Sequence, residues 1–247
     1  MLINQLLCQS PGLLNLGRLP VRATFFTYSD EKTALAAAGT PDRGEFYTSL
    51  NGQWSFKYLE SPALLNENLL NEDTAAWDNI AVPGAWTVQG YDKPHYTNVQ
   101  MPYKNMPPEV PQENPTGIYR REFELDESWN NQRIILHFDG VESFFAVRIN
   151  GKDAGICCWE PFAYDLSGLF QEGNNTLELE LTTSLRNMLG PHHLAEGESY
   201  FIHTMSFNKD PNFIDRKPAP YSAGYNFVNF GIANAAPAEN SNTKALY

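Results

Sequence analysis

Hydrophobic and polar residues alternate along several stretches of the chain, and this period of two predicts strands with one buried and one solvated face. In the clearest stretch, "TLELELT", we expect Leu177, Leu179 and Leu181 to face the core and Glu178 and Glu180 to face the solvent. Four further stretches alternate in the same way: "QWSFKYL" (53–59), "YRREFEL" (119–125), "RIILHFDG" (133–140) and "FFAVRIN" (144–150).

Turn signals connect these predicted strands. "NGK" (150–152) predicts a hairpin, because Asn-Gly tolerates the positive φ angles of a type I′ turn. "EGNNT" (172–176) is a second turn rich in glycine and asparagine. Short antiparallel strands at this spacing predict an all-β fold, either a β-sandwich or a jelly roll.

The pattern divides the chain into three parts. Residues 1–48 are expected to form an irregular N-terminal arm with one short helix at 30–39, where acidic residues precede a run of Ala and Leu that ends at a glycine. Residues 49–232 are predicted to form the β domain, and "YNFVNFGI" (225–232) is its last predicted strand. Residues 233–247 are expected to form a flexible tail.

Composition and charge exclude some partners. Hydrophobic residues make up 42% of the 247 residues, so a real core can form, and the formal net charge of -12 argues against nucleic acid and anionic membranes. The three cysteines, Cys8, Cys157 and Cys158, are odd in number and two are adjacent, which favours reduced thiols and a cytoplasmic location. We expect Cys157-Cys158 to lie on a strand with one thiol buried. No apolar run is long enough to span a membrane.

Five stretches in order carry a family resemblance. They are "RLPVRATFFTYSDEKTALA" (18–36), "SLNGQWSFKYLESP" (49–62), "VPGAWTVQGYDKPHYTNVQMPY" (82–103), "VPQENPTGIYRREFEL" (110–125) and "LHFDGVESFFAVRINGKDAG" (136–155). Together they resemble the N-terminal, sugar-binding domain of glycoside hydrolase family 2, of the bacterial β-galactosidase type. The resemblance covers roughly residues 10–182, and the segment 184–224 departs from the family pattern.

The resemblance implies a galactose-binding-like jelly-roll β-sandwich and a β-galactoside as ligand. In the family, an immunoglobulin-like domain and a TIM barrel with the two catalytic glutamates follow this domain. This sequence ends before either would begin, so we expect no catalytic residue in it and no turnover from it alone. No cofactor is expected, because Mg or Na would belong to the full-length family enzyme.

The resemblance also nominates residues that contact the sugar. In "HYTNV", Asn98 matches the family asparagine that hydrogen-bonds the galactosyl unit, and a carboxamide suits this role because it both donates and accepts. The alternative is that Asn98 only turns the loop. Tyr96 and His95 would shape the loop or form an aromatic wall. Trp86 in "VPGAW" would either stack on a pyranose or, as we prefer, anchor the loop in the core.

Two other motifs have plainer interpretations. "QENPTG" (112–117) contains a glutamate, but nothing nominates the second carboxyl that a retaining glycosidase needs, so we interpret it as a loop that leads into a strand. "GPHHLAEGE" (190–198) would be a metal site only if both adjacent histidines reached one ion. On an extended segment their side chains point opposite ways, so a loop that lines a groove is preferred and no metal ligand is assigned.

Three functional hypotheses remain. The first is a non-catalytic carbohydrate-binding and assembly domain of a family 2 glycoside hydrolase. The second is a stand-alone lectin-like module, which would bind sugar without a partner. The third is a structural subunit that complements a separately encoded catalytic barrel.

Overall fold

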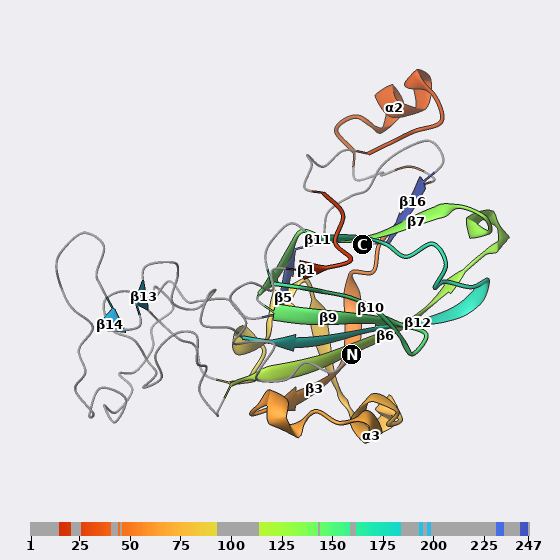
Figure 1. The fold of residues 1–247 in the computed structure, drawn as a ribbon. Coiled ribbons are helices and arrows are strands. Elements are labelled where there is room, and N and C mark those ends of the chain that lie inside the picture. The colour runs from red at the N-terminus through yellow and green to blue at the C-terminus, as the bar shows by residue number, and fades with distance from the viewer. Residues whose placement is uncertain are drawn as a thin grey trace.

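The computed structural model describes residues 15–20, 26–40, 44, 46–92, 114–142, 144–158, 162–183, 193–194, 197–198, 231–234 and 243–246. Its largest element is a seven-stranded antiparallel sheet. In spatial order the strands are β1 (Asn15–Leu16), β10 (Lys152–Cys157), β9 (Phe144–Ile149), β12 (Gly173–Thr182), β6 (Thr116–Leu125), β3 (Gly52–Leu59) and β4 (Asp78–Val82). Figure 1 shows β9, β12 and β6 at the centre of this sheet.

A second sheet covers one face of the first. It has the order β11 (Phe162–Asp165), β7 (Arg133–Phe138), β16 (Thr243–Leu246) and β2 (Tyr47–Thr48). Within the segment 233–247, which is expected to form a tail, residues 243–246 form β16, which pairs in parallel with both β7 and β2. Smaller sheets join β5 (Gly84–Ala85), β15 (Gly231–Asn234) and β8 (Gly140–Glu142), and β13 (His193–Leu194) with β14 (Gly197–Glu198).

The main core lies between the two larger sheets, and the alternating residues fill it as expected. Leu177, Leu179 and Leu181 are each fully buried, and Trp54 and Phe56 of β3 pack in the same cluster. The all-β prediction is therefore confirmed, and the strand arrangement is consistent with a jelly-roll sandwich. The division into arm, domain and tail at residues 48 and 232 stays a prediction.

The other face of the main sheet was expected to be wet, and this expectation is wrong for β12. Glu178 is 5% exposed and Glu180 is fully buried. The reason is that the chain between β3 and β4 folds back over this face, carrying α3 (Glu67–Leu70) between two short 3-10 helices, Pro62–Leu64 and Thr74–Ala76. This excursion buries a second apolar cluster on the sheet, consisting of Leu59, Leu65, Leu70, Trp77, Ile118, Phe144, Ala146, Ile156 and Cys158.

A row of charges crosses four strands beneath this excursion. Arg120, Glu178, Arg148 and Asp153 are successive cross-strand partners on β6, β12, β9 and β10. Their charges alternate in sign, and opposite charges on facing strand residues attract. The Glu178 carboxylate lies 2.6 Å from Arg120 Nη2 and 3.6 Å from Arg148 Nη1, and Arg148 Nε lies 3.7 Å from Asp153. We call these four residues the charge row.

The excursion also satisfies the remaining donors of Arg120. Its Nη1 donates to the Glu72 carbonyl at 2.6 Å and its Nη2 to the Leu70 carbonyl at 2.7 Å. The guanidinium lies 4.5 Å from the centre of the Trp77 ring, within cation–π range. Lys57 forms an ion pair with Glu72, which ties the excursion to β3. The charge row therefore holds the covering segment as well as the strands.

The N-terminal arm is partly built into the sandwich. Its strand β1 extends the main sheet by pairing with β10, and the Leu19 N–H donates to the Ala163 carbonyl of β11 at 2.7 Å. The predicted short helix is confirmed as α2 (Glu31–Ala37), where the Asp30 side chain caps the Thr33 N–H. In Figure 1, α2 lies away from the main sheet.

The structure describes both the predicted hairpin and the cysteine pair. Asn150 and Gly151 both have positive φ angles, of 51° and 75°, as a type I′ turn requires. The Asn150 side chain also accepts from the Thr176 N–H at 2.9 Å. Cys157 and Cys158 are both buried, so the expectation of one buried thiol is wrong. Their side chains join the two apolar clusters on opposite faces of the sheet, because adjacent strand residues point opposite ways.

Candidate functional site

The residues predicted to contact a sugar belong to the connection between β5 and β6. His95, Tyr96 and Asn98 lie within 93–113, outside the described residues, and their sugar contacts stay a prediction. The structure does describe the residues on both sides of this connection, up to Asp92 and from Asn114 onward. These flanking residues define the candidate site.

The first flank is held by an aromatic cluster. Trp86 is fully buried, with its ring centre 6.1 Å from that of Phe56 and 6.3 Å from that of Tyr58. Tyr91 packs edge-on against Phe56 at 4.7 Å, and its N–H donates to the Trp86 carbonyl at 3.1 Å. Trp86 is thus an anchor in the core, the position expected of it in preference to stacking on a sugar.

Gln89 fixes the backbone of the same flank. Its side-chain oxygen accepts from the Ala81 N–H at 2.8 Å, and its side-chain nitrogen donates to the Ala81 carbonyl at 3.0 Å. A carboxamide can form both bonds at once because it carries a donor and an acceptor. The turn between β4 and the aromatic cluster is therefore closed by one side chain.

The second flank is held by buried polar groups. Asn114 is 1% exposed, donates from Nδ2 to the Thr183 carbonyl at 3.0 Å, and accepts from the Thr183 hydroxyl. The hydroxyls of Thr116 and Thr182 lie 2.8 Å apart across β6 and β12. The Thr182 hydroxyl also lies 3.1 Å from the Pro115 carbonyl. Because buried polar groups are costly when unpaired, this network fixes where the chain rejoins the sheet.

Both flanks meet at one end of the sandwich. A Cβ atom on Gly117 would lie 2.6 Å from the Phe56 ring and 2.9 Å from the Trp86 ring, so the glycine lets the first flank pack directly on β6. Thr183 directly follows β12, and β15 returns to pair with β5 and β8. We call this region the loop end, defined by Trp86, Tyr91, Asn114, Thr116 and Thr183.

Tyr58, Tyr91 and Tyr119 of the aromatic cluster beside the loop end all have raised pKa values, so their phenols stay protonated near neutral pH. Burial raises the pKa of Tyr119 and, with help from the carboxylates of Asp92 and Glu60, that of Tyr58. Burial also raises the pKa of Tyr91, aided by a hydrogen bond with Asp78. Phenol hydroxyls that stay protonated can donate to and accept from uncharged hydroxyl groups.

The residues that build the second flank carry no strong signal in the sequence. "QENPTG" was correctly interpreted as leading into a strand, since β6 begins at Thr116. The burial of Asn114 and its bond to Thr183 were missed, because 69 positions separate the two residues and neither lies in a hydrophobic pattern. The polar sequence Asn114-Pro115-Thr116, at the start of a buried strand, was the feature that could have indicated this network.

Two further expectations concern metals and membranes. Among the residues that the structure describes, no three His, Cys, Asp or Glu side chains gather closely enough to hold a metal ion. His193 and Glu198 of the "GPHHLAEGE" stretch are backbone partners on β13 and β14, whereas His192 and Glu196 lie outside the described residues. None of the described helices is long and apolar enough to cross a membrane.

Comparisons with known proteins agree with this architecture. The family model for glycosyl hydrolases family 2, sugar binding domain, matches residues 47–188. The chain is 42% identical over 137 residues to a β-galactosidase of Psychromonas ingrahamii, an alignment that covers 54% of this chain and 13% of that protein. It is 41% identical over 140 residues to a β-galactosidase of Vibrio cholerae, covering 55% of this chain and 14% of that protein.

Among solved structures, a β-glucuronidase of an uncultured Clostridium sp. is similar at 21% identity and a TM-score of 0.38, over 53% of this chain and 21% of that one. For the two β-galactosidases, the part aligned with this chain amounts to about one seventh of their length. The matched residues 47–188 run from β2 through β12 and include both flanks of the loop end. With more than half of its length matched, the chain belongs to glycosyl hydrolases family 2, through its sugar binding domain.

Proposed function

We propose that this chain is a non-catalytic, sugar-binding and assembly domain of a β-galactosidase-type family 2 enzyme. Its role is to complete the subsite for a terminal β-galactoside, with Asn98 as the contacting residue. The catalytic glutamates come from a barrel outside these 247 residues, and hydrolysis would follow the family's retaining mechanism there. The domain itself needs no metal or other cofactor.

The observation that carries this proposal is the double anchoring of the 93–113 connection. Its first flank is clamped by Trp86 and Tyr91, and its second by Asn114 bonded to Thr183. Contacts with a ligand are productive when their supporting residues are fixed by packing and hydrogen bonds. The identity to two β-galactosidases supports galactose as the sugar.

Assembly with a barrel and an immunoglobulin-like domain is the second part of the proposal. The alignment with about one seventh of each relative supports a larger working unit. We place that unit in the cytoplasm, because Cys157 and Cys158 are buried and form no disulfide bond within the described part of the chain. A carbohydrate and the remaining enzyme domains are the partners, and the net charge of -12 speaks against nucleic acid and anionic membranes.

Three measurements on the purified 247-residue chain test the proposal. A chromogenic β-galactoside should not be hydrolysed, and turnover that persists through purification contradicts the non-catalytic role. Addition of a barrel-containing β-galactosidase fragment should produce activity, and the Asn98→Ala variant should produce much less. Full activity in that variant would overturn the assignment of Asn98.

A titration with galactose and lactose separates the remaining hypotheses. Weak or absent binding by the chain alone is expected, because an incomplete subsite offers few contacts. Strong binding that depends on Asn98 would instead indicate a stand-alone lectin-like module. Asn98→Asp is the matched variant, because it keeps the shape of the side chain and removes its donor.

A further inference from the structure

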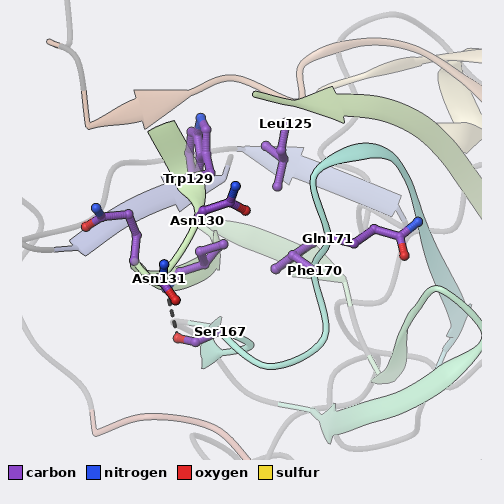
Figure 2. A pocket seen from close by; sticks show the side chains of 9 residues that line it. Leu125, Trp129, Asn130, Asn131, Ser167, Phe170 and Gln171 are labelled. Atoms are coloured by element: carbon purple, nitrogen blue, oxygen red, sulfur yellow. Dashed lines mark hydrogen bonds between the residues drawn. The ribbon is translucent and has the colours of Figure 1, made fainter. Parts of the chain in front are cut away.

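A polar cavity lies at the end of the sandwich opposite the loop end. It has a volume of about 170 Å³ and is lined by the end of β6, the turn that follows it and the segment between β11 and β12. Figure 2 shows the lining residues Trp129, Asn130 and Asn131 together with Ser167, Phe170 and Gln171 of the segment between β11 and β12. We call this the distal cavity.

The distal cavity is separate from the loop end. Leu125, in its wall, ends the same strand that Thr116 begins, nine residues earlier. At about 3.3 Å per residue, the two sites are roughly 30 Å apart. All the described residues of its lining lie within 125–134 and 167–171, and we expect ligand binding there to be independent of Asn98.

Carboxamides dominate the polar lining. Asn130 donates to Glu172 at 2.6 Å and Gln171 donates to the Asn174 carbonyl at 2.9 Å, which leaves their oxygens as acceptors. The side chains of Asn131 and Gln132 have no hydrogen-bond partner among the described residues. Carboxamides both donate and accept, which matches the paired hydroxyl groups of a sugar.

Aromatic side chains complete the wall. Phe170 projects toward the cavity in Figure 2 and is braced by the Phe123 ring, with 6.1 Å between ring centres. Trp129 is 7% exposed and closes the cavity from the turn. A cavity of about 150 Å³ accommodates a benzene-sized ring, so about 170 Å³ has room for one six-membered ring. Small-ligand sites commonly combine apolar walls with a few convergent polar groups.

The charges around the distal cavity favour a neutral sugar over an anionic one. All nine lining residues are uncharged, and the charged groups bonded to the lining are the Glu172 carboxylate, through Asn130, and the Asp165 carboxylate, through Ser167. The nearby guanidinium of Arg133 is already paired with Asp165 at 2.7 Å. Among the described residues, an anionic sugar would therefore meet two carboxylates, and the nearby guanidinium is already engaged, whereas a neutral sugar would not be repelled.

We propose that the distal cavity binds one neutral pyranose ring, as a second carbohydrate site. Phe170 packs against the ring, and Asn131 and Gln132 hydrogen-bond its hydroxyl groups. This goes beyond completion of the catalytic subsite, because it gives the domain a contact with carbohydrate that is independent of any barrel.

Amide-resolved NMR titration of the 247-residue chain tests the proposal. Galactose, glucose and mannose are the neutral probes, and glucuronate is the charged control. At least one neutral sugar should shift the amide signals of Asn130, Asn131, Gln132 and Gln171 in a saturable way, and glucuronate should shift them much less. Unshifted signals up to the solubility of all three neutral sugars would overturn the site, and equal shifts with glucuronate would overturn its preference for neutral ligands.

Variants assign the contacts and separate the two sites. Asn131→Gly with Gln132→Ala should weaken binding about tenfold, the loss expected for two neutral hydrogen bonds. Glycine keeps the positive φ of 57° at position 131, so the backbone is not strained. Asn68→Ala, an exposed carboxamide on α3, is the matched control and should bind like the parent chain.

Asn98→Ala distinguishes this inference from the proposed function. It should leave the distal shifts unchanged while it lowers activity in the barrel complementation assay. If it abolishes the distal shifts, or if the Asn131 and Gln132 variant binds as tightly as the parent, the second site is wrong. Backbone signal dispersion of each variant verifies that it is folded.

Discussion

Arg120 and Glu178 face each other on adjacent strands, with 2.6 Å between the guanidinium and the carboxylate, and both residues are under 10% exposed. The pair is buried by the excursion that crosses the sheet between β3 and β4. Burial raises the pKa of Glu178, while the hydrogen bonds and charge of Arg120 and the charge of Arg148 oppose that shift. The fold therefore depends on keeping the two charges together.

Removal of one member of this pair should be severe. Glu178→Ala leaves Arg120 buried without its carboxylate, and we expect the free energy of unfolding to fall by about 3–5 kcal/mol. Urea denaturation monitored by tryptophan fluorescence measures this. Glu124→Ala, at an exposed glutamate further along β6, is the control and should change stability by less than about 0.5 kcal/mol.

Replacement of both members should be milder than removal of one. Arg120→Met with Glu178→Leu removes both charges and keeps similar volumes, so the double variant should be more stable than Glu178→Ala. Arg148 keeps Asp153 as a charged neighbour in this background. A double variant as unstable as the single one would show that the hydrogen bonds of Arg120 to the excursion, and not its pairing with Glu178, dominate.

Gly117 lets the aromatic cluster of the loop end reach β6. Gly117→Ala would place a methyl group 2.6 Å from the Phe56 ring and 2.9 Å from the Trp86 ring, and such overpacking should cost about 1–3 kcal/mol. Thermal unfolding and the Trp86 side-chain NMR signal report the change. Gly168→Ala is the matched control, because no described atom lies within 4 Å of the methyl group that it would add, and it should be tolerated.

Gly155 governs the attachment of the N-terminal arm. A Cβ atom there would lie 2.6 Å from the Leu16 carbonyl and 2.5 Å from the Tyr164 ring. Gly155→Ala should therefore displace β1 from the sheet edge. Hydrogen exchange should accelerate at Leu16 and Leu19 while β12 amides remain protected; unchanged exchange at Leu16 would contradict this placement of the arm.

We expect Asn114 to affect sugar binding indirectly, because it fixes the position of the second flank and does not contact the ligand itself. Asn114→Ala leaves Thr183 groups without their buried partner, so stability should drop by about 1–3 kcal/mol. In the barrel complementation assay, the affinity for galactoside should fall although Asn114 touches no ligand. Asn79→Ala, an exposed asparagine on β4, should alter neither quantity.

The ionisation of Asp165 makes the stability of the fold depend on pH. Its partial burial would raise its pKa, but hydrogen bonds from Ser167 and Arg133 outweigh this and lower it. The carboxylate therefore stabilises the fold above the ordinary aspartate pKa of about 3.9, and this contribution is lost as the pH falls through the lower folded value. The pair is partly exposed, so the effect should stay below about 1 kcal/mol. Carboxyl NMR titration should show a higher Asp165 pKa in Arg133→Gln.

The strands and their inward faces could be predicted from the sequence, because a period of two directly encodes which side chains share a face. The burial of Glu178 and Glu180, which were expected to face the solvent, could not be predicted. It comes from residues 60–77, which fold over the sheet from a distant part of the sequence. The strand β16 was missed for a related reason. Its four residues show little hydrophobic pattern, and its place is set by pairing with β7 and β2.

The candidate site was predictable only in part. The family motifs located the connection 93–113 and the aromatic anchor at Trp86, because both lie in continuous stretches of sequence. The second flank joins Asn114 to Thr183 across 69 positions, and no local pattern contains that contact. The distal cavity likewise forms from two separate turns, so neither turn alone suggested a binding site.

Both flanks leave the sandwich at the same end, and this arrangement has an evolutionary consequence. The Thr116 and Thr182 hydroxyls close β6 and β12 at one fixed register, so the pairing of these strands is set where the chain leaves the sheet. Insertions or deletions beyond this point can therefore accumulate without disturbing the sandwich. A lineage could change what the domain recognises by exchanging these connections, while the folding of the scaffold stays the same.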